Sequence, residues 1–178
     1  MKIQVLALMA AATVMLVGCV VSERERQLAL VPEALRVSAV AYASEIGIGV
    51  GPGANETGIV VYEMPVAFRR SLEAEGLTFL RSLPMPLRDG SPMYDRWQDT
   101  PVRAEPDWPR DHFSSDANQY RIRDYTDQYL SSEMDPAVEK MVDDALAAPG
   151  NYYAQRRGRA QIIVIIPSER RIVFAYSG

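Results

Sequence analysis

The sequence predicts one small α+β or α/β domain, a sandwich of three to five strands with two or three helices. Three observations lead to this fold class. Apolar residues recur three and four apart in some segments and at every second residue in others, which indicates both helices and strands. The chain ends in two β-branched runs separated by a short polar turn, the pattern of a C-terminal β-hairpin. Its 178 residues leave room for one domain and a targeting segment.

The first expected element is an amphipathic helix that begins near residue 32. Pro32 suits the first position of a helix. An apolar stripe then follows at spacings of three and four residues, formed by Leu35, Ala39, Tyr42 and Ile46. This spacing predicts that the helix continues to about residue 46.

Four glycines follow within residues 47–53. A phosphate-binding loop needs its glycines between a strand and the start of a helix, so that amide groups point at the phosphates. Here the glycines follow an expected helix, and no Gly-Lys-Ser/Thr comes after them. The segment therefore argues against nucleotide binding and favours a loop or a glycine-rich edge strand.

The middle of the chain predicts a strand, a helix and a second strand. Residues 59–64 read as the first strand, and residues 65–76 as a helix with Phe68 and Leu72 on its apolar face. Residues 77–83 alternate in polarity and predict the second strand. This order permits a parallel pair of strands joined by a right-handed crossover.

The last third of the chain predicts a weak strand, a helix and the terminal hairpin. Residues 118–125 alternate weakly, and Asp135 with Pro136 is a typical helix start. The hairpin strands are expected at residues 161–166 and 171–176. The first of these runs is apolar on both sides, which predicts a central strand covered on both faces.

Residues 84–116 form a proline-rich segment without a sustained period. Six prolines among these residues preclude a long regular element, so the segment is expected to be either a functional loop or a mobile one. Its two tryptophans, Trp97 and Trp108, either secure the loop to the core or present a surface to a partner. We take them as candidate partner-surface residues.

A dense group of arginines precedes the hairpin. Arg156, Arg157 and Arg159 follow Tyr152 and Tyr153, and arginine with tyrosine can hold phosphates or sugar acids. These three arginines are candidate anion contacts. The alternative is a solvated loop that leads into the hairpin.

The N-terminus has the pattern of an export signal. Lys2 supplies a positive charge, an apolar run follows over residues 3–17, and the run ends in the sequence Leu16-Val17-Gly18-Cys19. An uncleaved membrane anchor over residues 3–21 is the main alternative, because that run approaches the length of a spanning helix.

These four residues resemble the lipobox of bacterial lipoproteins. The resemblance implies cleavage before Cys19 and attachment of a diacylglyceryl group and an acyl chain such as palmitate to that cysteine. It divides the chain into a signal peptide (1–18), a lipidated N-terminus with a tether (19–31) and a globular part (32–178). Val20 stands where an inner-membrane retention signal would have aspartate, so the outer membrane, facing the periplasm, is favoured. Lipidation also accounts for the single cysteine of an exported chain.

The charge balance excludes nucleic acid as the expected partner. Lys2 is the only charged residue within 1–18, so the remainder carries 18 basic and 23 acidic side chains. Nucleic-acid binding favours a basic face instead. An acidic chain also gains no general attraction to anionic headgroups, so membrane residence would depend on the lipid.

One segment contains the residue types of a serine hydrolase. His112 is the only histidine, with Asp111, Ser114 and Ser115 beside it. A Gly-x-Ser-x-Gly elbow is missing from the sequence, and serine and aspartate are also common turn residues. With one histidine and one cysteine, the sequence predicts no transition-metal site and no cofactor.

Two functional hypotheses follow. The favoured one is a membrane-anchored envelope lipoprotein with a non-enzymatic binding or structural role towards a protein or cell-wall partner. The alternative is a membrane-tethered hydrolase that acts on envelope material through the His112 segment.

Overall fold

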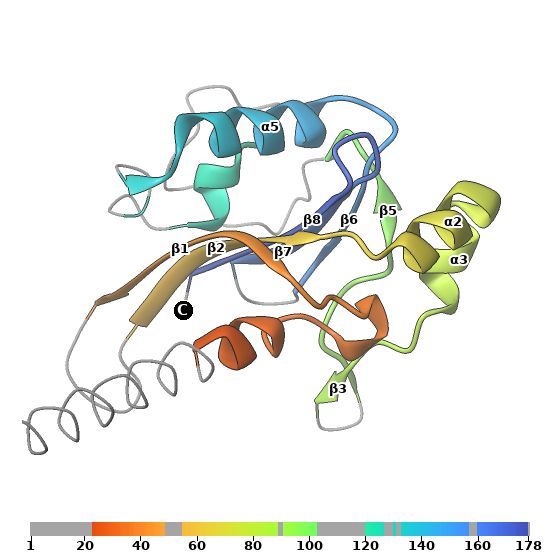
Figure 1. Cartoon of the computed structure of the whole chain (residues 1–178), viewed down its shortest axis with the longest axis horizontal. Helices are drawn as coiled ribbons and strands as arrows, with labels where there is room; N and C mark the ends of the chain where they lie inside the picture. The colour runs from red at the N-terminus through yellow and green to blue at the C-terminus, as the bar shows by residue number, and fades with distance from the viewer. Residues whose placement is uncertain are drawn as a thin grey trace, which may run out of the picture.

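The computed structural model of the chain describes residues 23–48, 55–88, 91–102, 120–126, 130, 133–156 and 160–177. Its centre is one antiparallel sheet of six strands in the order β1-β2-β8-β7-β6-β5 (Figure 1). The bounds are β1 (Val40–Ile48), β2 (Asn55–Glu63), β5 (Gln98–Asp99), β6 (Tyr152–Gln155), β7 (Gln161–Ile166) and β8 (Arg171–Ser177). A separate two-stranded ladder joins β3 (Leu87–Arg88) to β4 (Ser91–Pro92).

The helical elements surround this sheet. They are η1 (Glu33–Leu35), α2 (Val66–Glu75), α3 (Leu77–Ser82), η2 (Ile122–Tyr125) and α5 (Pro136–Ala147), with a further helical segment at residues 23–28. The α+β prediction is confirmed. Every neighbouring pair in the sheet is antiparallel, so the α/β alternative is wrong. The sheet has six strands rather than three to five, and a single sheet with covering layers replaces the expected sandwich. Among the described residues, no helix combines the length and the apolar character needed to cross a membrane.

The predicted hairpin forms the middle of the sheet. Strands β7 and β8 pair with Ile162 opposite Ala175 and Val164 opposite Val173. All six residues of β7 are buried, as its doubly apolar pattern predicted. Strand β6 was not predicted, because its four residues are too few to show a period.

Alternating side chains of the same strands build two apolar clusters, one on each side of the sheet. We call the side covered by α5 and η2 the α5 face, and the other the groove face (Figure 1). The α5 face buries Ile59, Val61, Ile162, Val164 and Val173 against Ile122, Tyr125, Val142 and Leu146. The groove face buries Val60, Tyr62, Ile163, Ile165 and Phe174 against Val31, Leu35, Phe68, Leu72 and Trp97.

The predicted helix over residues 32–46 is wrong. A short 3₁₀ turn ends at Arg36, whose φ of 52° is left-handed, and β1 begins at Val40. Tyr42 and Ile46 both pack on the α5-face cluster. Two residues four apart share a face in a strand as well as in a helix, so this spacing did not distinguish the two structures.

The predicted strand over residues 77–83 is also wrong, although the helix before it is confirmed. Helix α2 ends at Gly76, whose φ is +56° and whose N–H donates to the carbonyl of Leu72 at 2.8 Å. The chain then turns into α3, which buries Leu80. The ring of Phe79 in α3 packs edge to face on the ring of Phe68 in α2, with the ring centroids 5.2 Å apart. Helix α3 therefore packs against α2. The parallel crossover is therefore absent from the described sheet.

Residues 122–125 are helical rather than extended. Of the predicted strand at 118–125, the described part forms η2, in which Arg121 N–H donates to the Asp124 carboxylate at 2.8 Å. The predicted start of α5 is confirmed: Asp135 accepts a hydrogen bond from the N–H of Ala137 at 2.8 Å, and Pro136 takes the first helical position. The helix ends at Ala147, just before the Pro-Gly pair.

Candidate binding groove

A groove of about 1260 Å³ lies on the groove face. One wall is the N-terminal segment from Glu25 to Val37, and the sheet contributes residues of β2, β7 and β8. The region of β3 and β4 closes the other side through Pro86, Met93 and Tyr94. Nine lining residues are apolar and five are charged, so the groove offers an apolar surface with charges at defined places.

The floor of the groove is aromatic and belongs to the core. The rings of Phe174 and Tyr176 stack with centroids 5.3 Å apart. Phe174, Tyr94 and Tyr176 are 3%, 5% and 6% exposed, so only the edges of these side chains reach the groove. Most of each ring is held by the surrounding core, which makes this floor a fixed surface.

The 3₁₀ turn η1 shapes the N-terminal wall. Leu35 is fully buried in the groove-face cluster, and the next residue, Arg36, has the left-handed backbone that ends the turn. A non-glycine residue in this conformation is strained by about 1 kcal/mol or more, and it persists where the surroundings determine it. The buried Leu35 supplies that constraint, and Arg36 is left exposed on the groove wall.

At one end of the groove, Arg156 follows directly after β6. Its Nη1 donates to Oε1 of Gln161 at 2.8 Å, and its backbone bridges to Tyr94. Among the residues that the structure describes, no carboxylate forms an ion pair with Arg156. Burial raises the pKa of the Tyr94 hydroxyl, and the nearby Arg156 charge only partly opposes that effect. This end therefore presents a guanidinium beside a neutral phenol.

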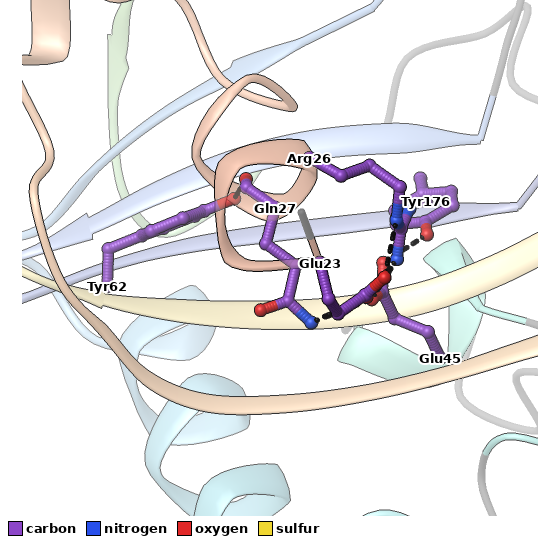
Figure 2. A network of polar contacts seen from close by, with 6 residues as sticks. All are labelled: Glu23, Arg26, Gln27, Glu45, Tyr62 and Tyr176. Carbon is purple, nitrogen blue, oxygen red and sulfur yellow. Dashed lines mark hydrogen bonds and ion pairs between the residues drawn. The ribbon is translucent and has the colours of Figure 1, made fainter. Parts of the chain in front are cut away.

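At the other end, a group of charged and polar residues centres on Glu45; we call it the Glu45 network (Figure 2). The carboxylate of Glu45 accepts from the Tyr176 hydroxyl at 2.6 Å and from Arg26 Nη2 at 2.5 Å. Arg26 also donates to Glu23 at 2.7 Å. Burial, and then the contact with Glu45, raises the pKa of Tyr176, so its phenol stays protonated and donates. The Arg26 hydrogen bond lowers the pKa of Glu23.

Gln27 extends the Glu45 network to a third strand. Its Nε2 donates to Glu45 at 3.0 Å, and its backbone carbonyl accepts from the Tyr62 hydroxyl at 2.7 Å (Figure 2). The Glu45 side chain is only 15% exposed, and these donors replace the water that it lost. The helical segment 23–28 is thereby attached to β1, β2 and β8 at once.

Gly58 makes the close approach of these side chains possible. A Cβ atom on Gly58 would lie 2.8 Å from a ring carbon of Tyr176 and 2.9 Å from Cγ of Glu45. Both distances are shorter than real Cβ contacts, so a larger residue would displace one of the two. A smaller cavity of about 380 Å³ surrounds this network and shares Glu56 and Tyr176 with the groove.

The residues predicted as sites fall into two groups. Trp97 is described and 1% exposed, inside the groove-face cluster, so its indole offers no partner surface and the inward-packing alternative holds for it. Its backbone carbonyl accepts from Arg81 Nε at 3.1 Å, which holds the chain there. Arg156 lines the groove. The remaining predicted residues lie outside the described part of the chain: Cys19, Trp108, His112, Arg157 and Arg159.

Sequence reasoning missed the Glu45 network. Arg26 and Tyr176 stand 19 and 131 residues from Glu45 along the chain, so no local pattern joins them. The one available signal was the charge of Glu45 inside an otherwise uncharged run over residues 40–48.

Comparison with models of known protein families, with curated proteins and with solved structures finds no match to this chain. The described residues also contain no group of three histidine, cysteine or acidic side chains placed to hold a metal ion. The proposed function therefore depends on the groove, the Glu45 network and the N-terminal sequence.

Proposed function

We propose that this protein is a membrane-anchored envelope lipoprotein that binds a ligand in its groove without transforming it. The observation that carries the proposal is the attachment of the helical segment 23–28 to the sheet by the Glu45 network. That segment forms part of the groove wall, and it begins only four residues after Cys19. Four residues of chain span at most about 14 Å. A lipid on Cys19 would hold the groove close to the bilayer surface.

The chemistry of the groove supports binding rather than hydrolysis. Its described lining has no serine, threonine, cysteine, histidine or lysine, and its carboxylates are those of Glu25, Glu33 and Glu56. The carboxylate and phenol at the Glu45 end already bond to each other. The hydrolase alternative needs His112 as its base, and His112 lies outside the described residues. The described lining of the groove contains no histidine that could act as the base instead.

The experiment is N-terminal mass analysis of the protein isolated from cell membranes. We expect the wild-type chain to begin at Cys19 with the added mass of its acyl groups. Cys19→Ser should lack that mass, whereas the matched control Ser22→Ala should keep it. A wild-type chain that begins at Met1 without lipid would overturn the anchor, as would a lipid-modified Cys19→Ser chain.

A second experiment addresses which membrane holds the protein. The resemblance to lipoproteins implies that aspartate directly after the modified cysteine retains the protein in the inner membrane. We expect Val20→Asp to move the protein to inner-membrane fractions on a density gradient, and Val20→Ala to leave it in the outer membrane. Wild-type protein in the inner membrane would contradict the proposed location.

A further inference from the structure

We propose that the groove holds the acyl chain of an anionic membrane amphiphile, with the chain along the apolar N-terminal wall and the anionic head at Arg156. This inference rests on the proposed function, because the membrane supplies the ligand. Three observations support the inference: the direction of the groove across the strands, the different charges at its two ends, and the few residues that separate the groove wall from Cys19.

The groove runs across the strands of the sheet. Its sheet residues lie on β2 (Glu56), β8 (Tyr176), β7 (Gln161) and at the end of β6 (Arg156), in the order in which these strands pair. Three strand spacings of about 4.8 Å separate β2 from β6, so the groove is about 14 Å long or more. Its volume of about 1260 Å³ exceeds the usual range of small-molecule sites, roughly 300–1,000 Å³. An elongated ligand fits this shape.

The apolar surface along this path comes mainly from the N-terminal wall. Phe174 lies in the floor, and Leu28, Val31 and Val37 line the wall. Leu28 and Val37 are only partly buried, so they have apolar area left for a ligand to cover. Each methylene group buried there contributes about 0.8 kcal/mol.

An extended peptide fits this floor less well than an acyl chain. Peptides that bind sheets gain most of their affinity from main-chain hydrogen bonds to an exposed strand edge. Strands β7 and β8 each pair on both sides, so their backbone groups are already used. An acyl chain needs no such bonds.

The two ends of the groove differ in charge, which gives the amphiphile its orientation. Glu56 lines both cavities and therefore lies at the Glu45 end, where it would repel an anionic head. At the opposite end, Arg156 has Gln161 as its described hydrogen-bond partner and keeps its charge available. The Tyr94 hydroxyl beside it can donate to the same head. Arg36 on the wall adds a second cation, with Glu33 in the same turn.

The anchor favours the membrane as the source of the ligand. Glu25 and Leu28 belong to the segment that begins four residues after Cys19, and both line the groove. A lipidated chain would therefore bring the groove within reach of lipids that leave the bilayer. The protein's own acyl groups lack the anionic head that the Arg156 end would recognise.

Photocrosslinking of the full protein in phosphatidylcholine vesicles tests this proposal. The probe is a palmitic acid analogue with a diazirine at the chain end, and the comparison probe is the matching long-chain alcohol. We expect saturable labelling at the end of the groove opposite Arg156, in peptides that contain residues 25–30 or Glu56. The labelling should be about tenfold stronger for the acid, because a charged hydrogen bond contributes about 1.5 kcal/mol or more. Arg156→Gln should remove the preference for the acid. The exposed Arg70→Gln, which loses the same charge on α2 outside the groove lining, should keep it.

Three results would overturn the proposal. The first is an absence of saturable labelling in the groove, and the second is equal labelling of the wild type by the acid and the alcohol. The third is complete displacement of the acid probe by inorganic phosphate, which would indicate a simple anion site. Mass analysis of the N-terminus on the same sample separates this failure from failure of the anchor. A lipidated chain with an unlabelled groove counts against the ligand alone. A labelled groove in a chain without lipid counts against the anchor and the membrane source.

Discussion

The two faces of the central sheet are built from the same strands but are covered differently. On the α5 face, a regular helix and a 3₁₀ turn place apolar side chains directly on the sheet. On the groove face, α2 and α3 cover one part of the sheet. The N-terminal segment covers another part; after residue 28 its only regular element is the short turn η1, and a polar network attaches it to the sheet. A groove remains beside that segment and not under α5.

This difference indicates how one small sheet can combine stability with a binding surface. A helix with a continuous apolar stripe fills the space above a sheet, because its side chains interdigitate with those of the strands. An irregular segment follows its own backbone and leaves open volume beside it. We therefore expect core substitutions on the α5 face to affect stability most, and substitutions that line the groove to affect ligand binding more than stability.

The largest expected effect is on the α5 face. Leu146→Ala should lower the free energy of unfolding by about 2–5 kcal/mol, because Leu146 is 1% exposed and its removal leaves a cavity. Leu28→Ala, the same change at a half-buried groove position, should lower it by about 1 kcal/mol or less. Urea denaturation measures both values. Equal losses would contradict the distinction between the two faces.

The next effect concerns the close packing at Gly58. Gly58→Ala should lower stability by about 1–3 kcal/mol, because the added methyl group meets the Tyr176 ring and the Glu45 side chain. Gly47→Ala is the matched control, since no atom lies within 4 Å of the position of its Cβ. It should stay within about 0.5 kcal/mol of the wild type. Thermal melting checks both, and a tolerated Gly58→Ala would mean that the Glu45 network can move aside.

The pH dependence of stability tests the buried phenol of Tyr176. Its pKa is raised in the folded protein, chiefly by burial, so its contribution to stability is complete below the ordinary tyrosine pKa of about 10 and is lost at higher pH. Tyr176→Phe should lower stability at neutral pH by about 1.5 kcal/mol, because Glu45 loses a donor. Above about pH 10, its stability should fall less steeply with pH than that of the wild type. Identical alkaline slopes would show that Tyr176 ionises freely.

The smallest effect is expected at Asp143 on the α5 face. Its carboxylate accepts from the N–H of Ile122 at 2.7 Å, and burial raises its pKa. Asp143→Asn keeps an acceptor without the buried charge, so stability at neutral pH should stay within about 0.5 kcal/mol. Asp143→Ala leaves the N–H unpaired and should lose about 1 kcal/mol.

The pH profile of the same variants sharpens this prediction. A raised carboxyl pKa contributes stability at low pH that is lost as pH rises through the folded-state pKa. Wild-type stability relative to Asp143→Asn should therefore improve as the pH falls. The opposite trend in denaturation experiments would mean that the Ile122 hydrogen bond outweighs burial.

Local signals determined several elements before any tertiary contact was known. The β7–β8 hairpin follows from two β-branched runs around a polar turn, and helices α2 and α5 follow from proline at the start and glycine or Pro-Gly at the end. Each signal lies within a few residues of the element that it defines. The predicted C-terminal hairpin therefore has the correct position and partner.

Tertiary structure decided what these signals left ambiguous. The spacing of Tyr42 and Ile46 suits a helix or a strand, and pairing with β2 makes it a strand. The alternating polarity of residues 77–83 suited a strand, but residues 77–82 form helix α3, which packs against α2. Aromatic character alone did not decide whether Trp97 faces outward, and the groove-face core buries it.

The export pattern and the lipobox-like residues before Cys19 came from the sequence alone, because such signals are contiguous. The groove and the Glu45 network came from the fold alone. Their members are contributed by the N-terminal segment and by strands from both ends of the chain, and only sheet pairing brings Glu45, Gly58 and Tyr176 together. A contiguous motif can be read along the chain, whereas a site assembled from distant residues has no sequence signature until the strands are paired.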